Sequence, residues 1–511
     1  MVAKRVGSHA GAGLAIASAL AGIGALAALI VSGCTDAGLA PNVDASVGTD
    51  ASAADGQVAN VDANVDAISL DQAFSCRSAS GVGGIGKGTD LTRFVVDQSA
   101  FPKARCNDGT PAVFYYRPAA TDVSRNKWVI QLNGGGGCRS GQACANRFCG
   151  FDTNFSAFQM SSKETPTGTH GEGILDRRSD NPWGDWNHVF VHFCTSDNWA
   201  GQAEGRVLSA VAPNAADAGV VSYRIDFLGA YVVDAVVATL RKAGGPAVSV
   251  AGVAAPDLDD ASHVVLAGAS AGGGGVARHA DALGALLAQN RPTCGASPCA
   301  LDFRALIDSS LAPSYDSYDL SASPLCTAMK LCSWEDIMRN EYTAGGFATW
   351  GARTDDSCLS WQKANAPGFE WRCADNDYLM AHHITTPMLV RMGQRDELHF
   401  RAVTEGNFQK KDGGGPVDEA TFAALVRESL GGLTSLKSMA NERSAIAVTP
   451  AVFGPSCTKH ETLRNSEHVF DVRIPVDGKN VNMIDVWQAW LAGSTPTAAI
   501  AQPGVAGNCP K

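Results

Sequence analysis

The stretch His263-Val-Val-Leu-Ala-Gly-Ala-Ser-Ala-Gly272 decides the fold. Its first five residues are an apolar, β-rich run, and a helical pattern over 275–289 follows the small residues. A strand that turns sharply into a helix at Gly-x-Ser-x-Gly is typical of a nucleophile elbow, in which a side chain at either glycine would clash with neighbouring backbone. This context indicates that Ser270 is a nucleophile, although an ordinary glycine turn is the alternative in a chain with 55 glycines.

Apolar runs and helical patterns alternate on both sides of this stretch. We expect strands at 113–116, 128–132, 188–193, 263–267, 303–307, 388–392 and 469–474, and the clearest helices at 225–241 and 275–289. This alternation predicts an α/β domain, a mainly parallel sheet covered by helices on both faces. The segment 326–378 holds four cysteines, and we expect it to be a disulfide-stapled cap inserted into the domain.

The first 34 residues have the pattern of an export signal. Lys4-Arg5 precedes an uncharged stretch over 11–31, and Val31-Ser-Gly-Cys34 resembles a bacterial lipobox. We therefore expect Cys34 to carry a lipid. Thr35 stands where an Asp would indicate inner-membrane retention, so an outer-membrane or cell-surface anchor is favoured. A helical anchor and an ordinary secretory signal are the alternatives.

Residues 35–75 differ sharply in composition from the rest of the chain. They contain seven Asp and no Lys or Arg, and no aromatic residue precedes Phe74. Like charges without apolar bulk cannot collapse into a core, so this segment predicts a disordered tether. A short strand region is the alternative. The folded domain is expected to span 76–511.

Charge and cysteine content limit the possible partners. The chain has 40 Lys and Arg against 51 Asp and Glu, with no basic cluster of five or more, which argues against nucleic acid. Setting Cys34 aside leaves 14 of the 15 cysteines, an even number that predicts up to seven disulfides in an exported protein, including the short loops 294–299 and 326–332. No Cys-x-x-Cys and no histidine pair at ligand spacing occurs, so a metal site is not expected.

An acyl-transfer serine needs hydrogen-bond donors for the oxyanion and a histidine oriented by a carboxylate. The backbone of Ala271 and the glycine-rich loop 133–138 after the strand at 128–132 are the expected donors. A phosphate-binding loop is the alternative, but no Lys-Ser/Thr follows these glycines. α/β-Hydrolases place acid and histidine after the serine, yet spacing alone does not choose between Asp396 and Glu397 or between His460 and His468.

Seven segments, in the same order along the chain, resemble the pectin acetylesterase and Notum family. They are 106–112, 128–138, 173–175, 186–201, 267–273, 384–396 and 456–460. The resemblance implies an α/β-hydrolase-like fold and a triad without a metal or organic cofactor. The residues it assigns are Ser270, Asp396 and His460 for the triad and Gly134, Gly135 and Ala271 for the oxyanion hole.

Two departures from the family pattern affect the expected substrate. Family members usually have Trp where this chain has Gly137, and commonly Cys where it has Ala269. The missing Trp removes an aromatic wall beside the expected acyl pocket.

The resemblance implies hydrolysis of O-acetyl esters on pectin or another polysaccharide through an acyl-enzyme. A lipid-type carboxylesterase or deacylase is the second reading, and a catalytically silent polysaccharide-binding surface protein is the third. Trp334, Trp350, Trp361 and Trp371 of the cap could stack on sugar rings, or they could pack the core of the cap itself.

Overall fold

The computed structural model describes most of the chain after residue 66. The described residues are 67–74, 85–151, 157–213, 219–241, 248–289, 291–295, 297–311, 313, 317–411, 413–435, 448–504 and 509–510. The expected signal segment, Cys34 and residues 35–66 of the expected tether lie outside this part.

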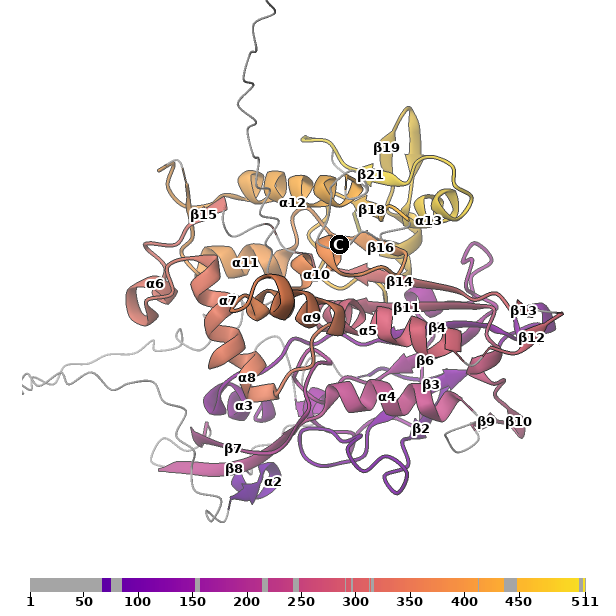
Figure 1. Cartoon of the computed structure of the whole chain (residues 1–511), viewed down its shortest axis with the longest axis horizontal. Helices are drawn as coiled ribbons and strands as arrows, with labels where there is room; N and C mark the ends of the chain where they lie inside the picture. Colours follow the sequence, from indigo (N-terminus) through magenta and orange to yellow (C-terminus); the bar gives the residue numbers. More distant parts are fainter. Residues whose placement is uncertain are drawn as a thin grey trace, which may run out of the picture.

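A ten-stranded mixed sheet forms the centre of the molecule (Figure 1). From one edge to the other its strands are β21 (Ala498–Ile500), β18 (Ala451–Gly454), β16 (Met388–Arg391), β14 (Asp302–Asp308), β11 (His263–Ala269), β4 (Lys127–Leu132), β6 (Asn187–Val191), β3 (Val113–Arg117), β2 (Lys87–Val95) and β5 (Gly168–Thr169). Neighbouring strands are parallel from β21 to β6, and β3, β2 and β5 extend the sheet in antiparallel pairing. The strand β11, which leads to Ser270, therefore lies inside the parallel part.

Side chains of the central strands alternate between two cores, as expected of a sheet buried on both faces. In β11, Val264 and Leu266 belong to the larger core, whereas Val265 and Ala267 belong to the other. The larger core also contains residues of α4 (Gly229–Leu240), α5 (Ala271–Gln289), α11 (Glu397–Glu405) and α12 (Glu419–Thr434). The second core is covered by α13 (Met483–Leu491), the 3-10 helix η3 (Gly173–Leu175) and the π-helical turn η8 (Glu467–Asp471). The expected α/β-hydrolase-like architecture is confirmed.

Most of the expected strands are present, but the segment 469–474 is not a strand of the central sheet. Its first half lies in η8, where Val469 and Phe470 are buried in the second core, and Ile474 begins β19 (Ile474–Val476) of a hairpin with β20 (Lys479–Val481). The helix expected at 225–241 begins at Gly229, because residues before it belong to β8 (Val220–Phe227). Apolar content alone does not separate these alternatives.

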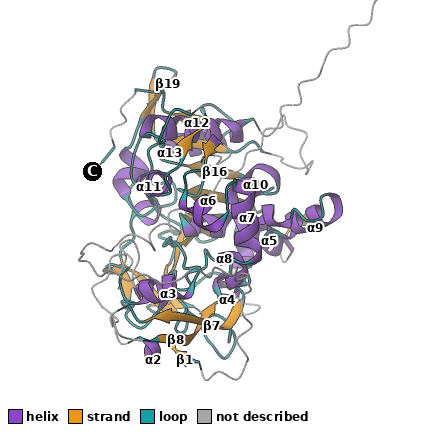
Figure 2. Ribbon diagram, turned by 90° about the vertical axis from the view of Figure 1, so that its left-hand side faces the viewer, coloured by secondary structure: helices purple, strands orange, loops and turns teal. Residues whose placement is uncertain are grey.

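The segment between β14 and β16 is helical and is stapled by Cys326–Cys332 and Cys358–Cys373. Its elements are α6 (Pro324–Met329), α7 (Trp334–Thr343), α8 (Gly346–Trp350), α9 (Asp356–Asn365), the 3-10 helix η6 (Glu370–Ala374) and α10 (Asn376–His382), which Figure 2 shows as a group of short helices. Trp334, Trp350 and Trp371 are at most 7% exposed, so they pack the interior. That the segment 326–378 covers the site stays a prediction.

The C-terminal end of the expected tether is folded, which corrects its boundary. β1 (Ile68–Ser69) pairs with β8 in a three-stranded sheet that also contains β7 (Ala203–Val211), and α2 (Leu70–Ala73) follows. Leu70 and Phe74 are buried, and the Phe74 ring packs edge-on at 5.0 Å from Tyr223. Two apolar side chains suffice here because the neighbouring sheet supplies the surface that they cover.

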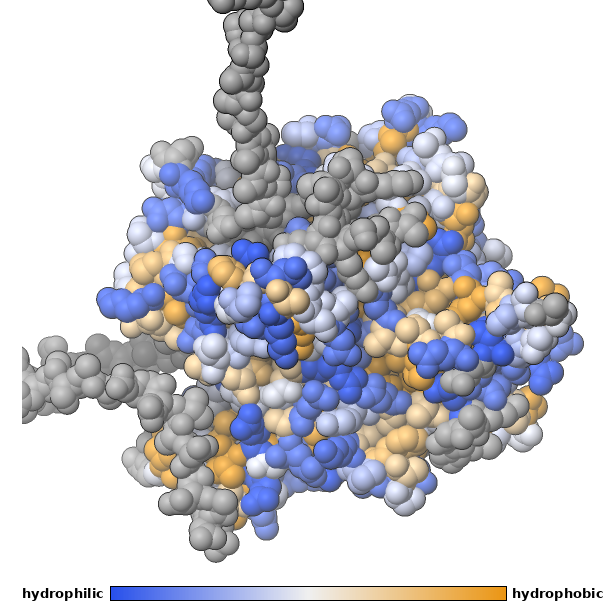
Figure 3. All heavy atoms as spheres, in the orientation of Figure 1, coloured by the Kyte–Doolittle hydropathy of each residue, from blue (hydrophilic) through white to orange (hydrophobic). Residues whose placement is uncertain are grey.

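The remaining described elements are short. They are α3 (Gly141–Phe148), the 3-10 helices η1 (Asp122–Ser124), η2 (Ala157–Met160) and η4 (Leu258–Asp260), and the paired strands β9 (Ser249–Val250) with β10 (Val253–Ala254), β12 (Thr293–Cys294) with β13 (Ser297–Pro298), and β15 (Tyr318–Asp319) with β17 (Gln409–Lys410). On the face drawn in Figure 3, hydrophilic side chains surround smaller apolar areas, as is typical of the surface of a folded domain.

Six disulfides join described cysteines: 106–194, 138–144, 294–299, 326–332, 358–373 and 457–509. Cys149 is also disulfide-bonded, and Cys76 lies outside the described residues. The expected loop staples 294–299 and 326–332 are therefore confirmed. This density of disulfides indicates export to an oxidising compartment.

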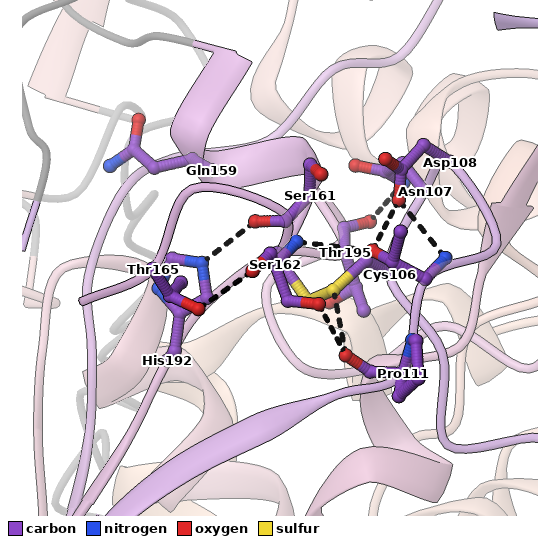
Figure 4. The surroundings of a disulfide bond; sticks show 12 residues. Cys106, Asn107, Asp108, Pro111, Gln159, Ser161, Ser162, Thr165, His192 and Thr195 are labelled. Carbon is purple, nitrogen blue, oxygen red and sulfur yellow. Dashed lines mark hydrogen bonds between the residues drawn. A yellow bond between two sulfur atoms is a disulfide. The ribbon is translucent and has the colours of Figure 1, made fainter. Parts of the chain in front are cut away.

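Figure 4 shows the Cys106–Cys194 disulfide, which ties the start of the domain to the segment after β6. Close to it, Asn107 Nδ2 donates to the Thr195 carbonyl oxygen at 2.8 Å, and the Ser162 hydroxyl donates to the Pro111 carbonyl oxygen at 2.6 Å. These bonds fix the backbone that leads into residues 195–197, which contact the glycine-rich loop of the site.

In the part of the chain that the structure describes, no helix combines the length and the apolar character needed to cross a bilayer.

Candidate active site

Ser270 occupies the turn between β11 and α5 in the strained conformation of a nucleophile elbow. Its φ is +53°, in the left-handed region that non-glycine residues rarely adopt. The Ser270 N–H donates to the Asp308 carbonyl oxygen at 2.9 Å, which holds the turn. A Cβ on Gly268 would lie 2.2 Å from the Gly272 carbonyl oxygen, and one on Gly272 would lie 2.2 Å from that of Leu132. The expected reason for both glycines is confirmed.

Asp396 and His460 meet at the carboxyl ends of the parallel strands. Asp396 caps the N-terminus of α11, accepting the N–H groups of Leu398 and His399 at 3.1 Å each. His460 Nδ1 lies 3.0 Å from Asp396 Oδ1 and 2.8 Å from Oδ2. Asp396 is completely buried, and the His460 side chain is 10% exposed.

Glu397 and His468, the alternatives to Asp396 and His460, lie outside this contact. Glu397 directs its side chain outward, 58% exposed and 3.9 Å from Lys459 Nζ, and His468 belongs to η8. The structure therefore brings together Asp396 and His460, which spacing alone left undecided.

The acid–histidine pair is electrostatically polarised. Burial alone would lower the pKa of His460, but the Asp396 carboxylate outweighs it and raises this pKa to about 8. Burial alone would raise the pKa of Asp396, but His460 and His399 bring it well below its ordinary value. The carboxylate is thus ionised and favours the imidazolium form of His460, as a general base requires when it accepts a proton.

Asp308 connects the elbow to the histidine loop. Its carbonyl oxygen holds the N–H of Ser270, and its Oδ2 accepts the N–H of Thr462 at 2.6 Å. Arg391 Nη1 lies 3.0 Å from Asp308 Oδ1, and both side chains are at most 1% exposed. Sequence reasoning missed this pair. The sequence did contain a signal for it. Asp308 is a charged residue immediately after the expected strand at 303–307, and Arg391 is a charged residue within the expected strand at 388–392.

The glycine-rich loop lies against the start of α5. Gly135 and Gly136 have φ of +138° and +60°, whereas Gly134 lies outside the left-handed region, and a Cβ there would be 2.8 Å from the Ala269 carbonyl oxygen. Ala271 is the first residue of α5, where backbone N–H groups have no partner within the helix. The loop that contains Gly134 and Gly135 is thus close to the turn that leads into Ala271, and their role as oxyanion donors stays a prediction.

Trp350 of α8 packs on the same loop. Its Nε1–H donates to the Cys138 carbonyl oxygen at 2.7 Å, and a Cβ on Gly137 would lie 2.9 Å from its ring atom Cζ2. Gly137 stands where family members usually have Trp. In this chain it is covered instead by an indole ring from the 326–378 segment. Because Trp350 is fully buried, it supports the loop rather than offering a face for a sugar.

Within the described residues, one group has potential metal-ligand atoms close together. These atoms, from Asp396, His399 and His460, all lie within 4.8 Å of one another. The hydrogen bonds between Asp396 and His460 already use two of the three residues, and burial keeps His399 neutral by lowering its pKa to about 4. The group thus consists of a hydrogen-bonded carboxylate–imidazole pair with a neutral imidazole beside it.

The chain is similar to several known proteins. Residues 87–298 match the model of the family described as PAE, pectinacetylesterase. Over these residues the chain is similar to the pectinacetylesterase family. Its fold is similar to that of the crystal structure of the Wnt deacylase Notum from Drosophila, with a TM-score of 0.56 and 21% sequence identity over 82% of this chain and 97% of that one.

Curated relatives of the chain include proteins from animals. It is 27% identical to palmitoleoyl-protein carboxylesterase notum2 of Xenopus laevis, over 71% of this chain and 60% of the relative. It is also 27% identical to palmitoleoyl-protein carboxylesterase NOTUM of Homo sapiens, over 72% of this chain and 61% of the relative. The chain thus spans about three fifths of the length of these relatives.

Proposed function

We propose that the protein is a serine esterase that removes O-acetyl groups from a polysaccharide such as pectin. The observation that carries this proposal is the orientation of His460. Its Nδ1 is bound to Asp396, while its Nε2 and Ser270 Oγ are both buried without a hydrogen-bond partner among the described residues. This leaves Nε2 available to accept the proton of the serine hydroxyl.

The proposed reaction runs in two steps through an acyl-enzyme. His460 accepts the proton of Ser270 as the hydroxyl attacks the ester carbonyl, and Asp396 stabilises the imidazolium. Backbone N–H groups of Gly134, Gly135 and Ala271 stabilise the oxyanion. His460 then returns the proton to the leaving alcohol, and water activated by His460 releases the acyl group from the serine.

A lipid-type deacylase is the second candidate, favoured by one observation. The curated relatives at 27% identity are named palmitoleoyl-protein carboxylesterases, a name that implies a long acyl chain. The two candidates share the triad and differ in the acyl group accepted. A catalytically silent binding protein would keep the fold but would not turn over any ester.

Hydrolysis of p-nitrophenyl esters from acetyl to dodecanoyl separates these candidates, with Ser270→Ala as the control variant. A preference for acetyl that the substitution abolishes supports the acetylesterase, and acetate release from pectin and acetylated xylan then identifies the polymer. Rates that rise with chain length would instead favour lipid deacylation. Absence of serine-dependent turnover on every ester would contradict both.

We also propose that the protein is held at the outer membrane or cell surface by a lipid on Cys34. The lipobox-like Val31-Ser-Gly-Cys34 supports this assignment, and such a position suits an enzyme that acts on external polymers. Replacing Cys34 by Ser should move the protein from the membrane fraction to the soluble fraction. Retention of the variant in the membrane fraction would contradict the anchor.

A further inference from the structure

Glu461 is a carboxylic acid beside the nucleophile that ester hydrolysis by the triad does not use. It follows His460 directly and has φ of +56°, a left-handed conformation that costs a non-glycine residue free energy. Strain of this kind persists only where the surrounding structure enforces it. The conformation of Glu461 is therefore a maintained feature of the site.

Contacts from the end of β14 hold this conformation. The Glu461 N–H donates to Ser309 Oγ at 3.3 Å, and the N–H of the next residue, Thr462, donates to Asp308 Oδ2 at 2.6 Å. The Thr462 hydroxyl donates to the same carboxylate oxygen at 3.1 Å. Buried carboxylates thus hold the two neighbours of Glu461 in the chain, His460 and Thr462. The Glu461 side chain is therefore restricted to one general direction.

That direction leads to the glycine-rich loop and the nucleophile. A Cβ on Gly134 would lie only 1.8 Å from Glu461 Oε1, so the carboxyl group occupies the space that a side chain at Gly134 would fill. The Ser270 hydroxyl is close enough to stabilise the ionised form of Glu461, although Ser270 Oγ has no partner at ordinary hydrogen-bond geometry. The carboxyl group is therefore close both to the nucleophile and to the glycine-rich loop.

The surroundings of the Glu461 carboxyl group favour its neutral form. Burial and the nearby carboxylates of Asp308 and Asp396 raise the pKa of Glu461, while His460 opposes them. Arg464 attracts the carboxyl group through space, and its own hydrogen bond is to Glu172 at 3.2 Å. A ligand group that donates a hydrogen bond to this carboxyl group would therefore stabilise it.

Glu461 adjoins the residue that is proposed to protonate the leaving alcohol. Ser270 is 4% exposed, while His460 and Glu461 are both intermediate in exposure. His460 returns a proton to the oxygen of the leaving alcohol, so the alcohol part of the ester must lie on the His460 side of Ser270. Glu461 follows His460 directly in the same loop and is partly accessible.

We propose that the Glu461 carboxyl group binds a free hydroxyl group that neighbours the ester oxygen on the alcohol part of the substrate. This inference rests on the proposed esterase function and narrows its substrate class to esters of polyhydroxylated alcohols, such as partly acetylated sugars. Aryl and simple alkyl esters have no such hydroxyl group. Glu461 is then a residue that sets substrate specificity through direct contact.

The test compares two acetate esters that differ only at the neighbouring hydroxyl group. One is a methyl glycoside with a single O-acetyl group beside a free hydroxyl, and the other is the same compound with that hydroxyl replaced by hydrogen. For the wild-type full chain we expect kcat/KM to be about 10- to 100-fold higher for the hydroxylated ester. In Glu461→Ala this ratio should fall close to one, whereas Glu461→Gln, which keeps an acceptor oxygen, should retain part of it.

Glu397→Ala is the matched control, because Glu397 is an exposed carboxylate at the start of α11, directly after the triad acid, and should leave the ratio unchanged. Equal kcat/KM for the two esters in the wild-type chain would overturn the proposal without any variant. A Glu461→Ala ratio equal to that of wild type would also overturn it and would assign Glu461 a structural role. Equal gains in kcat/KM on both esters would overturn it as well, because the carboxyl group would then obstruct the site. Failure of the esterase function itself would appear separately, as a lack of Ser270-dependent hydrolysis of p-nitrophenyl acetate.

Discussion

His460 Nδ1 lies 2.8 Å from Asp396 Oδ2, and this contact joins two residues 64 positions apart in the chain. Replacing Asp396 by Asn keeps the size of the side chain and removes the charge that stabilises the imidazolium. We expect kcat to fall on the order of 10³- to 10⁴-fold, as when the same change is made in a serine protease triad. The measurement is steady-state hydrolysis of p-nitrophenyl acetate.

Glu397→Gln is the control for this variant, because it removes a neighbouring carboxylate that is 58% exposed. Its kcat should stay within about twofold of wild type, as is usual for an exposed charge. A similar loss in both variants would mean that the general charge of this region, rather than the Asp396–His460 contact, supports activity.

The pH dependence of the reaction follows from the pKa of His460. Only the neutral imidazole can accept the serine proton, and Asp396 raises the pKa of His460 to about 8. The value of kcat/KM should therefore rise with pH through a midpoint near 8 and fall about tenfold per pH unit well below it. In the residual activity of Asp396→Asn, the midpoint should move to lower pH because the raising charge is gone. An unchanged midpoint would contradict the assignment of His460 as the base.

Gly134 tests the crowding around the expected oxyanion donors. A Cβ there would lie 1.8 Å from Glu461 Oε1 and 2.8 Å from the Ala269 carbonyl oxygen, so Gly134→Ala must displace the loop or the carboxyl group. We expect a loss of at least about 100-fold in kcat, the size of effect seen when one oxyanion donor is removed. Circular dichroism and thermal unfolding check that the variant folds.

Gly431→Ala is its matched control. Gly431 lies in α12, and a Cβ there meets no atom within 4 Å. This variant should keep full activity and gain about 0.5–1 kcal/mol in the free energy of unfolding, since alanine favours the helix. Unchanged activity in Gly134→Ala would show that the oxyanion donors lie elsewhere.

The local patterns of the sequence predicted the elbow well, because everything that shapes it lies within 263–272. The acid and the base could not be chosen in the same way. Their partnership depends on how the loops after β16 and β18 meet, and spacing contains no information on this. Apolar content also misplaced 469–474, which packs as the helical turn η8 against the second core.

Three residues that contribute to the site could not be predicted from sequence patterns, because their roles depend on tertiary contacts. Asp308 and Arg391 form a buried pair only because β14 and β16 are adjacent in the sheet. Trp350 fills the space above Gly137 from a segment more than 200 residues later. Each depends on tertiary contacts that no local period encodes.

The disulfide Cys457–Cys509 is expected to stabilise both the domain and its catalytic loop. It closes 52 residues of chain, and Cys457 stands three positions before His460. Replacing both cysteines by Ser should lower the free energy of unfolding by about 4 kcal/mol in the loop-entropy model and should also lower kcat. Thermal unfolding and ester hydrolysis of the same sample measure the two effects.

Removing Cys294–Cys299 provides the comparison. This disulfide closes a loop of five residues in an exposed hairpin, so its loss should cost about 2 kcal/mol and leave kcat unchanged. Equal effects of the two removals on activity would contradict a specific role of Cys457–Cys509 in holding the His460 loop.

The most direct test of the central claim is the site of covalent modification by an organophosphate ester, which traps an activated serine. Intact-protein and peptide mass spectrometry of the full chain should show one equivalent of adduct, located on Ser270, with loss of ester hydrolysis in proportion to labelling. Labelling should be abolished in Ser270→Ala and strongly slowed in His460→Ala. An adduct on another residue, or full hydrolytic activity in Ser270→Ala, would contradict the account.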